Sequence, residues 1–74
     1  MARRSVEAEA GGTVSKIELR EGQHVAREQL IMTIELMKME IAITAPSDGM
    51  LVQLLVAEGD TVIEGQELAI IETA

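Results

Sequence analysis

The feature that most constrains the fold of this chain is an internal repeat, in which residues 6–35 align without a gap on residues 43–72. Eight of the thirty aligned positions are identical, and apolar character is kept at several more. A match of this length predicts two copies of one supersecondary unit. Neither copy is long enough to bury a face alone, so the two must pack on each other. The identical pairs are Ala8/Ala45, Gly12/Gly49, Glu21/Glu58, Gly22/Gly59, Val25/Val62, Gln29/Gln66, Ile34/Ile71 and Glu35/Glu72.

Each half is typical of short strands separated by turns, and it shows no helical period. The pattern predicts an all-β fold, a flattened β-barrel or sandwich of two antiparallel sheets with approximate two-fold symmetry. We expect residues 1–5 to be an N-terminal tail and residues 6–73 to form the domain. Turn geometry is the interpretation of four glycines, Gly22, Gly49, Gly59 and Gly65. The expected core residues are Val14, Ile17, Leu19, Val25, Ile31, Ile34, Ile41, Ile43, Leu51, Leu54, Val56, Val62, Leu68 and Ile71.

The formal charge of −7 and the scattered basic residues argue against nucleic acid and anionic membranes as partners. No apolar stretch approaches the roughly 20 residues that span a bilayer, and the N-terminus lacks the apolar segment of a secretory signal. The chain has no cysteine and a single histidine, His24, so neither a disulfide framework nor a metal site is expected. We therefore expect a cytoplasmic chain whose acidity steers it toward basic partner surfaces.

The middle of the chain is typical of a β-hairpin, residues 31–43, with Met37 and Lys38 as the two central residues of its turn. Branched apolar residues recur in near period-two spacing on both sides, without Gly or Pro inside the run. This register gathers the apolar side chains on one face and two glutamates on the other. The expected cross-strand pairs are Leu36/Met39, Glu35/Glu40 and Ile34/Ile41.

A two-residue turn of this kind favours Asn-Gly, because both central residues take positive φ in the preferred type. Met37 and Lys38 suit it poorly, which indicates that something outside the fold reads this lysine. The flanking methionines are apolar and adaptable, as suits a surface that fits a partner. Counting back 37 positions from Lys38 reaches Met1. We therefore expect the two termini together at one end of the domain and Lys38 exposed at the opposite end.

Three motifs resemble the biotinyl domain of biotin carboxyl carrier proteins: Gly22-x-x-Val25-x-x-x-Gln29, Met37-Lys38-Met39 after Glu35, and Ala45-Pro46-x-x-Gly49. The resemblance covers about residues 6 to 73. It implies a carrier without catalytic residues of its own, in which a biotin protein ligase attaches biotin covalently to the ε-amine of Lys38. It further implies that the tethered biotin moves carboxyl groups from a biotin carboxylase to a carboxyltransferase, as in acetyl-CoA carboxylase, with acetyl-CoA, propionyl-CoA and pyruvate among the possible acceptors.

Among several departures from the family pattern, two concern single positions. Leu36 stands where the family commonly has Ala, which makes the tip bulkier. Glu28 stands at the place of Gly65 in the other repeat, so we expect backbone strain at Glu28 if that place requires positive φ.

The sequence also indicates that the chain does not activate its own lysine. A lysine amine is almost wholly protonated at neutral pH, and neither histidine nor a second cation lies near Lys38 in the sequence. Glu35 and Glu40 are the expected partner-recognition residues. Acylation of Lys38 removes its positive charge and leaves both glutamates unbalanced. We hypothesise that this imbalance helps the modified product leave its ligase.

Two other functions remain open from the sequence. A lipoyl carrier would use the same lysine with a different ligase. An unmodified β-sandwich adaptor would bind protein through the hairpin and would tolerate Lys38→Arg.

Overall fold

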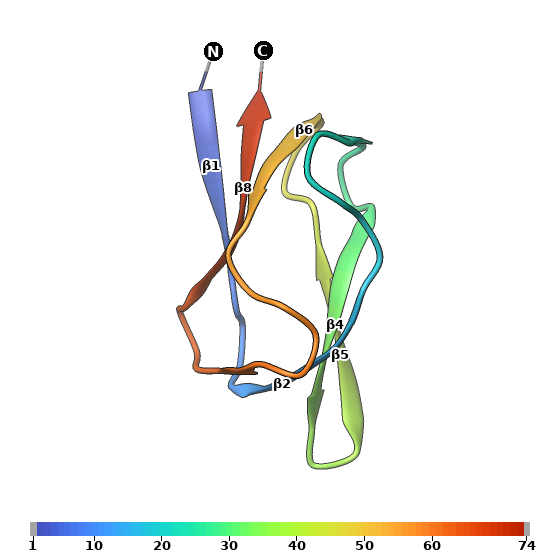
Figure 1. Cartoon of the computed structure of the whole chain (residues 1–74), viewed down its shortest axis with the longest axis vertical. Helices are drawn as coiled ribbons and strands as arrows, with labels where there is room; N and C mark the ends of the chain where they lie inside the picture. The colour runs from blue at the N-terminus through green and yellow to red at the C-terminus, as the bar shows by residue number, and fades with distance from the viewer. Residues whose placement is uncertain (1, 74) are drawn as a thin grey trace.

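The computed structural model describes residues 2–73, which form eight β-strands in two four-stranded antiparallel sheets (Figure 1). No helix occurs among these residues, and so none that could span a membrane. One sheet has the strand order β1-β8-β6-β3 and the other has the order β5-β4-β2-β7. The all-β sandwich expected from the sequence is confirmed. The strands are β1 (Ala2–Glu7), β2 (Gly12–Ile17), β3 (His24–Val25), β4 (Leu30–Leu36), β5 (Met39–Thr44), β6 (Gly49–Leu54), β7 (Thr61–Val62) and β8 (Glu67–Thr73).

The repeat of 37 residues appears directly in the strand order. Shifting β1, β2, β3 and β4 by 37 positions gives β5, β6, β7 and β8, and the same shift turns one sheet order into the other. The irregularities repeat as well, because the register shift after Val14 recurs after Leu51. The termini lie together at one end, and the hairpin of β4 and β5 protrudes at the other (Figure 1). This arrangement confirms the expected placement of the termini and the lysine turn.

The core lies between the two sheets and consists of aliphatic side chains, methionine and alanine alone. Ten of the fourteen residues expected there are buried, and the other four, Ile17, Ile41, Leu54 and Val56, are partly buried against it. Five further residues complete the core, and three of them are alanines. These additional buried residues are Val6, Ala8, Met32, Ala45 and Ala69.

Two glutamates tie each half of the molecule to the other. Glu21 Oε2 accepts a hydrogen bond from the backbone N–H of Leu54 at 2.8 Å. Its repeat partner Glu58 accepts one from the N–H of Ile17 at 2.9 Å. Both contacts join one turn to the strand of the opposite repeat, so this pair of identical residues caps strand ends that would otherwise lose a partner.

The structure corrects the interpretation of one glycine. Gly22, Gly59 and Gly65 take φ of 90°, 93° and 84°, as turn glycines do. Gly49 instead begins β6, and a Cβ placed there would lie 2.5 Å from the carbonyl oxygen of Glu72. Its repeat partner Gly12 has the same crowding. These two glycines permit the close approach of neighbouring strands rather than a turn.

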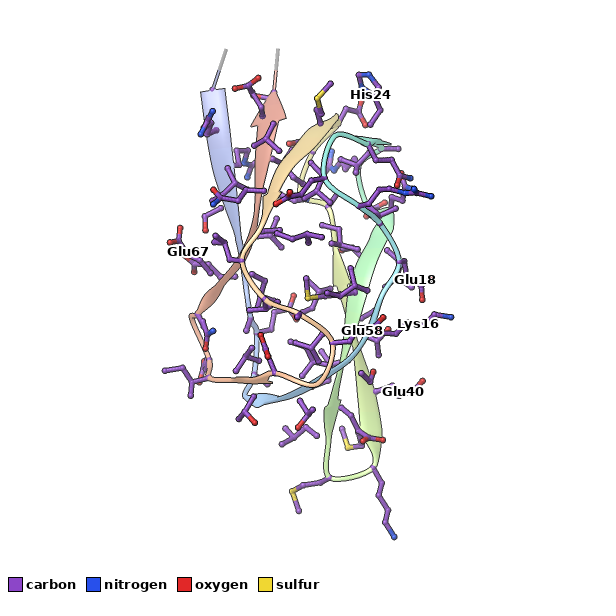
Figure 2. The ribbon with its side chains drawn as sticks, viewed as in Figure 1. Lys16, Glu18, His24, Glu40, Glu58 and Glu67 are labelled. Atoms are coloured by element: carbon purple, nitrogen blue, oxygen red, sulfur yellow. The ribbon has the colours of Figure 1, made fainter. Side chains whose placement is uncertain are left out.

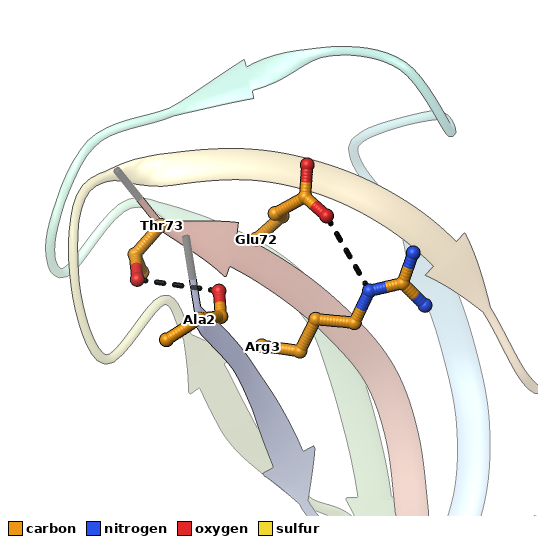
Figure 3. Close-up of polar contacts among 4 residues, drawn as sticks. All are labelled: Ala2, Arg3, Glu72 and Thr73. Atoms are coloured by element: carbon orange, nitrogen blue, oxygen red, sulfur yellow. Dashed lines mark hydrogen bonds and ion pairs between the residues drawn. The ribbon is translucent and has the colours of Figure 1, made fainter.

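The expected N-terminal tail is wrong for Ala2–Ser5, which form the first part of β1 and pair with β8. The pairing is reinforced by side chains, since Arg3 Nε lies 3.4 Å from Glu72 Oε2 and Thr73 Oγ1 donates to the carbonyl of Ala2 (Figure 3). The sequence signal was weak here because β1 falls partly outside the repeat. Met1 lies outside the described residues.

Candidate functional site

The candidate site is the turn of the β4–β5 hairpin. Ladder pairs place Leu36 opposite Met39 and Glu35 opposite Glu40, as the sequence predicted. Only Met37 and Lys38 lie between the strands, and their φ values are 51° and 65°. Positive φ at both central residues is the signature of the tight turn that follows the right-handed twist of two strands.

This turn carries local strain. A residue with a Cβ at positive φ costs about 1–2 kcal/mol relative to its right-handed form. Glu28 is the only other non-glycine residue at positive φ among residues 2–73, with φ of 70°. Its repeat partner Gly65 has φ of 84°, so the strain expected at Glu28 from the sequence is confirmed.

The side chains of the turn face solvent. Met37 is 88% exposed and Met39 is 63% exposed, whereas Met32 deeper in the same hairpin is fully buried. Lys38 is exposed as well, and within residues 2–73 its amine forms no ion pair. A covalent group joined at the amine would therefore need no rearrangement of the fold, and a partner can approach the nitrogen freely.

An apolar strip continues from the turn toward the core on the inner face of the hairpin. It runs from the exposed Met39 past the partly buried Leu36 to Ile41, which packs against the core. The equivalent residues at the opposite end are Ala2, Thr73 and Arg4, obtained by the 37-residue shift. The two ends share one backbone plan, so the apolar strip is a property of the lysine end alone.

The outer face of the hairpin is acidic. Glu35 and Glu40 are both exposed and directly paired across the ladder. Glu40 projects on the same side of the sheet as Lys16 and Glu18 (Figure 2). At the opposite end the equivalent pair is Glu72 with Arg3, whose charges compensate each other. The tip thus combines an apolar inner face, an acidic outer face and a single amine.

No histidine lies in the hairpin, and the described residues contain no cluster of potential metal ligands. His24, the single histidine, lies in β3 near the opposite end of the molecule (Figure 2).

Residues 4–71 match the protein family described as "Biotin-requiring enzyme", whose model covers biotin and lipoyl attachment domains. The chain belongs to this family. Domains of this family carry a covalently attached cofactor and are carrier domains, not themselves catalytic. The family resemblance stated from the motifs is confirmed.

Curated relatives include carboxylases and dihydrolipoyllysine-residue succinyltransferase components. The chain is 39% identical over 67 residues to pyruvate carboxylase of Staphylococcus aureus, covering 90% of this chain and 6% of the relative. It is 40% identical over 65 residues to the biotin-dependent acyl-coenzyme A carboxylase alpha3 subunit of Mycobacterium leprae, covering 88% and 11%. A probable dihydrolipoyllysine-residue succinyltransferase component of the mitochondrial 2-oxoglutarate dehydrogenase complex of Schizosaccharomyces pombe is 35% identical over 63 residues, covering 85% and 14%.

Solved structures of carboxylases share the fold. Urea carboxylase of Kluyveromyces lactis superposes with a TM-score of 0.91 at 28% identity, covering 97% of this chain and 6% of that one. A single-chain, multi-domain long-chain acyl-CoA carboxylase superposes with a TM-score of 0.86 at 28% identity, covering 92% and 7%. The chain thus spans a small part of these long proteins, the length of one attachment domain.

Proposed function

We propose that this chain is a biotin carrier of a biotin-dependent carboxylase, with biotin joined through an amide to Lys38. The observation that carries the proposal is the tip itself, where an exposed lysine stands between two exposed methionines on a protruding hairpin. Carboxylases among the sequence and structural relatives support biotin as the group.

Each residue of the tip has a distinct role in this proposal. The amine of Lys38 is the point of attachment, and a biotin protein ligase must remove its proton before the nitrogen can act as a nucleophile. Met37, Met39 and the apolar strip behind them fit the partner's surface. The strained turn holds the amine away from the sheets, so that partner enzymes reach it without contacting the core.

Glu35 and Glu40 are proposed as recognition residues on the outer face of the hairpin. Before modification they share the tip with the positive charge of Lys38, and afterwards that charge is gone. The like-charge pair then faces the ligase uncompensated, which favours release of the product. Replacing both with Gln should slow release or change the modification rate. An unchanged rate for both steps would contradict this role.

Biotin, when bound, supplies the carboxyl-carrying chemistry. The domain supplies the tether, which raises the local concentration of the group at each enzyme site that the tip can reach. We propose a biotin carboxylase and a carboxyltransferase as these partners, and the cytoplasm as the location. Binding at each site is weak and transient, because tight binding at one site would stall transfer to the next.

A lipoyl carrier is the second candidate, favoured by the succinyltransferase components among the relatives. It uses the same exposed amine and the same fold. The methionines flanking Lys38 favour biotin over lipoate in this chain. An unmodified adaptor, the third candidate, explains neither the strained turn nor the family membership.

Intact-mass analysis of the protein isolated from its natural host tests the proposal. We expect one biotinyl group per chain, lost in Lys38→Arg. The matched control is Lys16→Arg, which alters the only other lysine of the chain and should keep the modification. A mass increase of one lipoyl group would support the second candidate, and the absence of any adduct would overturn both carriers.

A further inference from the structure

We propose that the sulfurs of Met37 and Met39 form an oxidation site, at which peroxide converts the apolar flanks of Lys38 into polar sulfoxides and weakens docking of the tip. The inference rests on the proposed function and adds regulation by oxidation to the same site. Its origin is the unequal exposure of the methionines, 88% at Met37 and 63% at Met39 against none at Met32.

The chemistry requires only a peroxide. A thioether sulfur attacks one oxygen of hydrogen peroxide, the O–O bond breaks, an S=O bond forms and water leaves. The sulfur loses two electrons and the peroxide gains them. Methionine sulfoxide reductases reverse the step with electrons from thiols, and exposed sulfurs are open to these enzymes. Met32 is shielded from both reactions by complete burial.

Oxidation at this place should spare the fold. The Met37 side chain is almost fully exposed to solvent, so an added oxygen on its sulfur disrupts few packing contacts. Met39 contributes only part of its surface to the strip with Leu36. A sulfoxide at either position is therefore solvated rather than buried, unlike one in a core.

Oxidation should, however, strongly weaken the binding of a partner that covers the tip. The two methionines are the most exposed large apolar side chains of the hairpin, on either side of the modified lysine. A partner site that buries two apolar side chains would instead have to desolvate two polar sulfoxides. With about 1.5 kcal/mol lost per side chain, docking should weaken tenfold or more for each methionine oxidised.

The first measurement is peptide mapping by mass spectrometry after the folded chain is treated with dilute hydrogen peroxide. We expect one oxygen on Met37 and one on Met39 well before any on Met32. Equal oxidation of Met32 under conditions where circular dichroism shows the native fold would overturn the selectivity.

The second measurement is the kcat/KM of a biotin carboxylase for the biotinylated chain, before and after peroxide treatment of the carrier. We expect a fall of about a hundredfold or more for both sulfoxides together, restored by methionine sulfoxide reductases. Met37→Leu/Met39→Leu keeps the apolar flanks without sulfur beside Lys38. A fall that persists in this variant reports oxidation elsewhere, at another methionine or at the thioether of biotin, and it should be much smaller than the fall in the wild type. Met37→Gln/Met39→Gln should show the low value without peroxide.

The outcomes separate the two proposals. A chain that takes up biotin but keeps the same kcat/KM after oxidation overturns the proposed regulation by oxidation and leaves the carrier function intact. A chain that takes up no biotin, oxidised or not, overturns the carrier function and the regulation by oxidation that rests on it.

Discussion

Glu40 occupies in the lysine hairpin the position that Arg3 occupies at the opposite end of the molecule, and each faces a glutamate across its ladder. Arg3 forms an ion pair with Glu72, whereas Glu40 stands opposite Glu35. The two halves otherwise share the same strand arrangement. The oppositely charged pair at one end can therefore be compared directly with the like-charged pair at the other. The uncompensated pair lies at the end that carries the amine.

Glu40→Arg should therefore stabilise the protein by about 0.2–1 kcal/mol, because a like-charge cross-strand pair becomes an opposite-charge pair. The free energy of unfolding in urea at low salt measures the gain, which should shrink as salt is added. The matched change Arg3→Glu removes the ion pair at the other end and should destabilise by a similar amount. If the two substitutions shift stability in the same direction, pair charge is not the cause.

The same variants separate stability from recognition. Glu40→Arg should slow attachment at Lys38 or alter product release, since it changes the charge of the outer face beside the amine. Arg3→Glu acts at the far end and should leave the attachment rate unchanged. The check is a time course of biotin incorporation with each variant fully folded. A slower rate in Arg3→Glu of the same size would indicate a general effect of net charge.

Glu28→Gly should stabilise the protein by about 0.5–1 kcal/mol, because relief of the positive φ, worth about 1–2 kcal/mol, exceeds the entropy cost of glycine, about 0.5–1 kcal/mol. The Glu28 side chain forms no hydrogen bond or ion pair in the part of the chain that the structure describes, so little else is lost. Gly65→Ala is the reverse control. A Cβ at Gly65 meets no atom within 4 Å, so its cost reports the backbone alone. Thermal unfolding of both variants checks the two signs.

The sequence could predict what the repeat and the hairpin encode locally. The register around Lys38, the placement of the termini and the strain at Glu28 all follow from period-two spacing and from comparison of one repeat with the other. Contacts between the halves could not be predicted in the same way. The bond from Leu54 to Glu21 and the crowding at Gly49 depend on how two distant strands meet in space. Their only signal was identity between the repeats at a polar residue and at a glycine.

Gly12→Ala and Gly49→Ala should each destabilise the protein by about 1–3 kcal/mol, because a new Cβ would overlap a carbonyl oxygen of the neighbouring strand. The overlap at Gly12 is with Glu35 and that at Gly49 is with Glu72, at 2.5 Å in both cases. Only Gly12→Ala displaces the strand that leads to the turn, so only this variant should also slow attachment at Lys38. Chemical denaturation and biotin incorporation measured together distinguish the two effects. Equal attachment rates would show that the hairpin absorbs the displacement.

The final prediction concerns the cost of the turn to the fold. Replacing its two central residues by Asn-Gly, as Met37→Asn/Lys38→Gly, should raise the free energy of unfolding by about 1–2 kcal/mol, since both new residues accept positive φ. The exposed side chains that are removed contribute little packing, so the gain is that of the backbone. The single variant Met37→Asn should give part of this gain while retaining the amine. Equilibrium unfolding of the three proteins orders them as wild type, single and double variant. A double variant no more stable than wild type would mean that the turn is relaxed as it stands, and the argument that this lysine is kept at the expense of stability would fail.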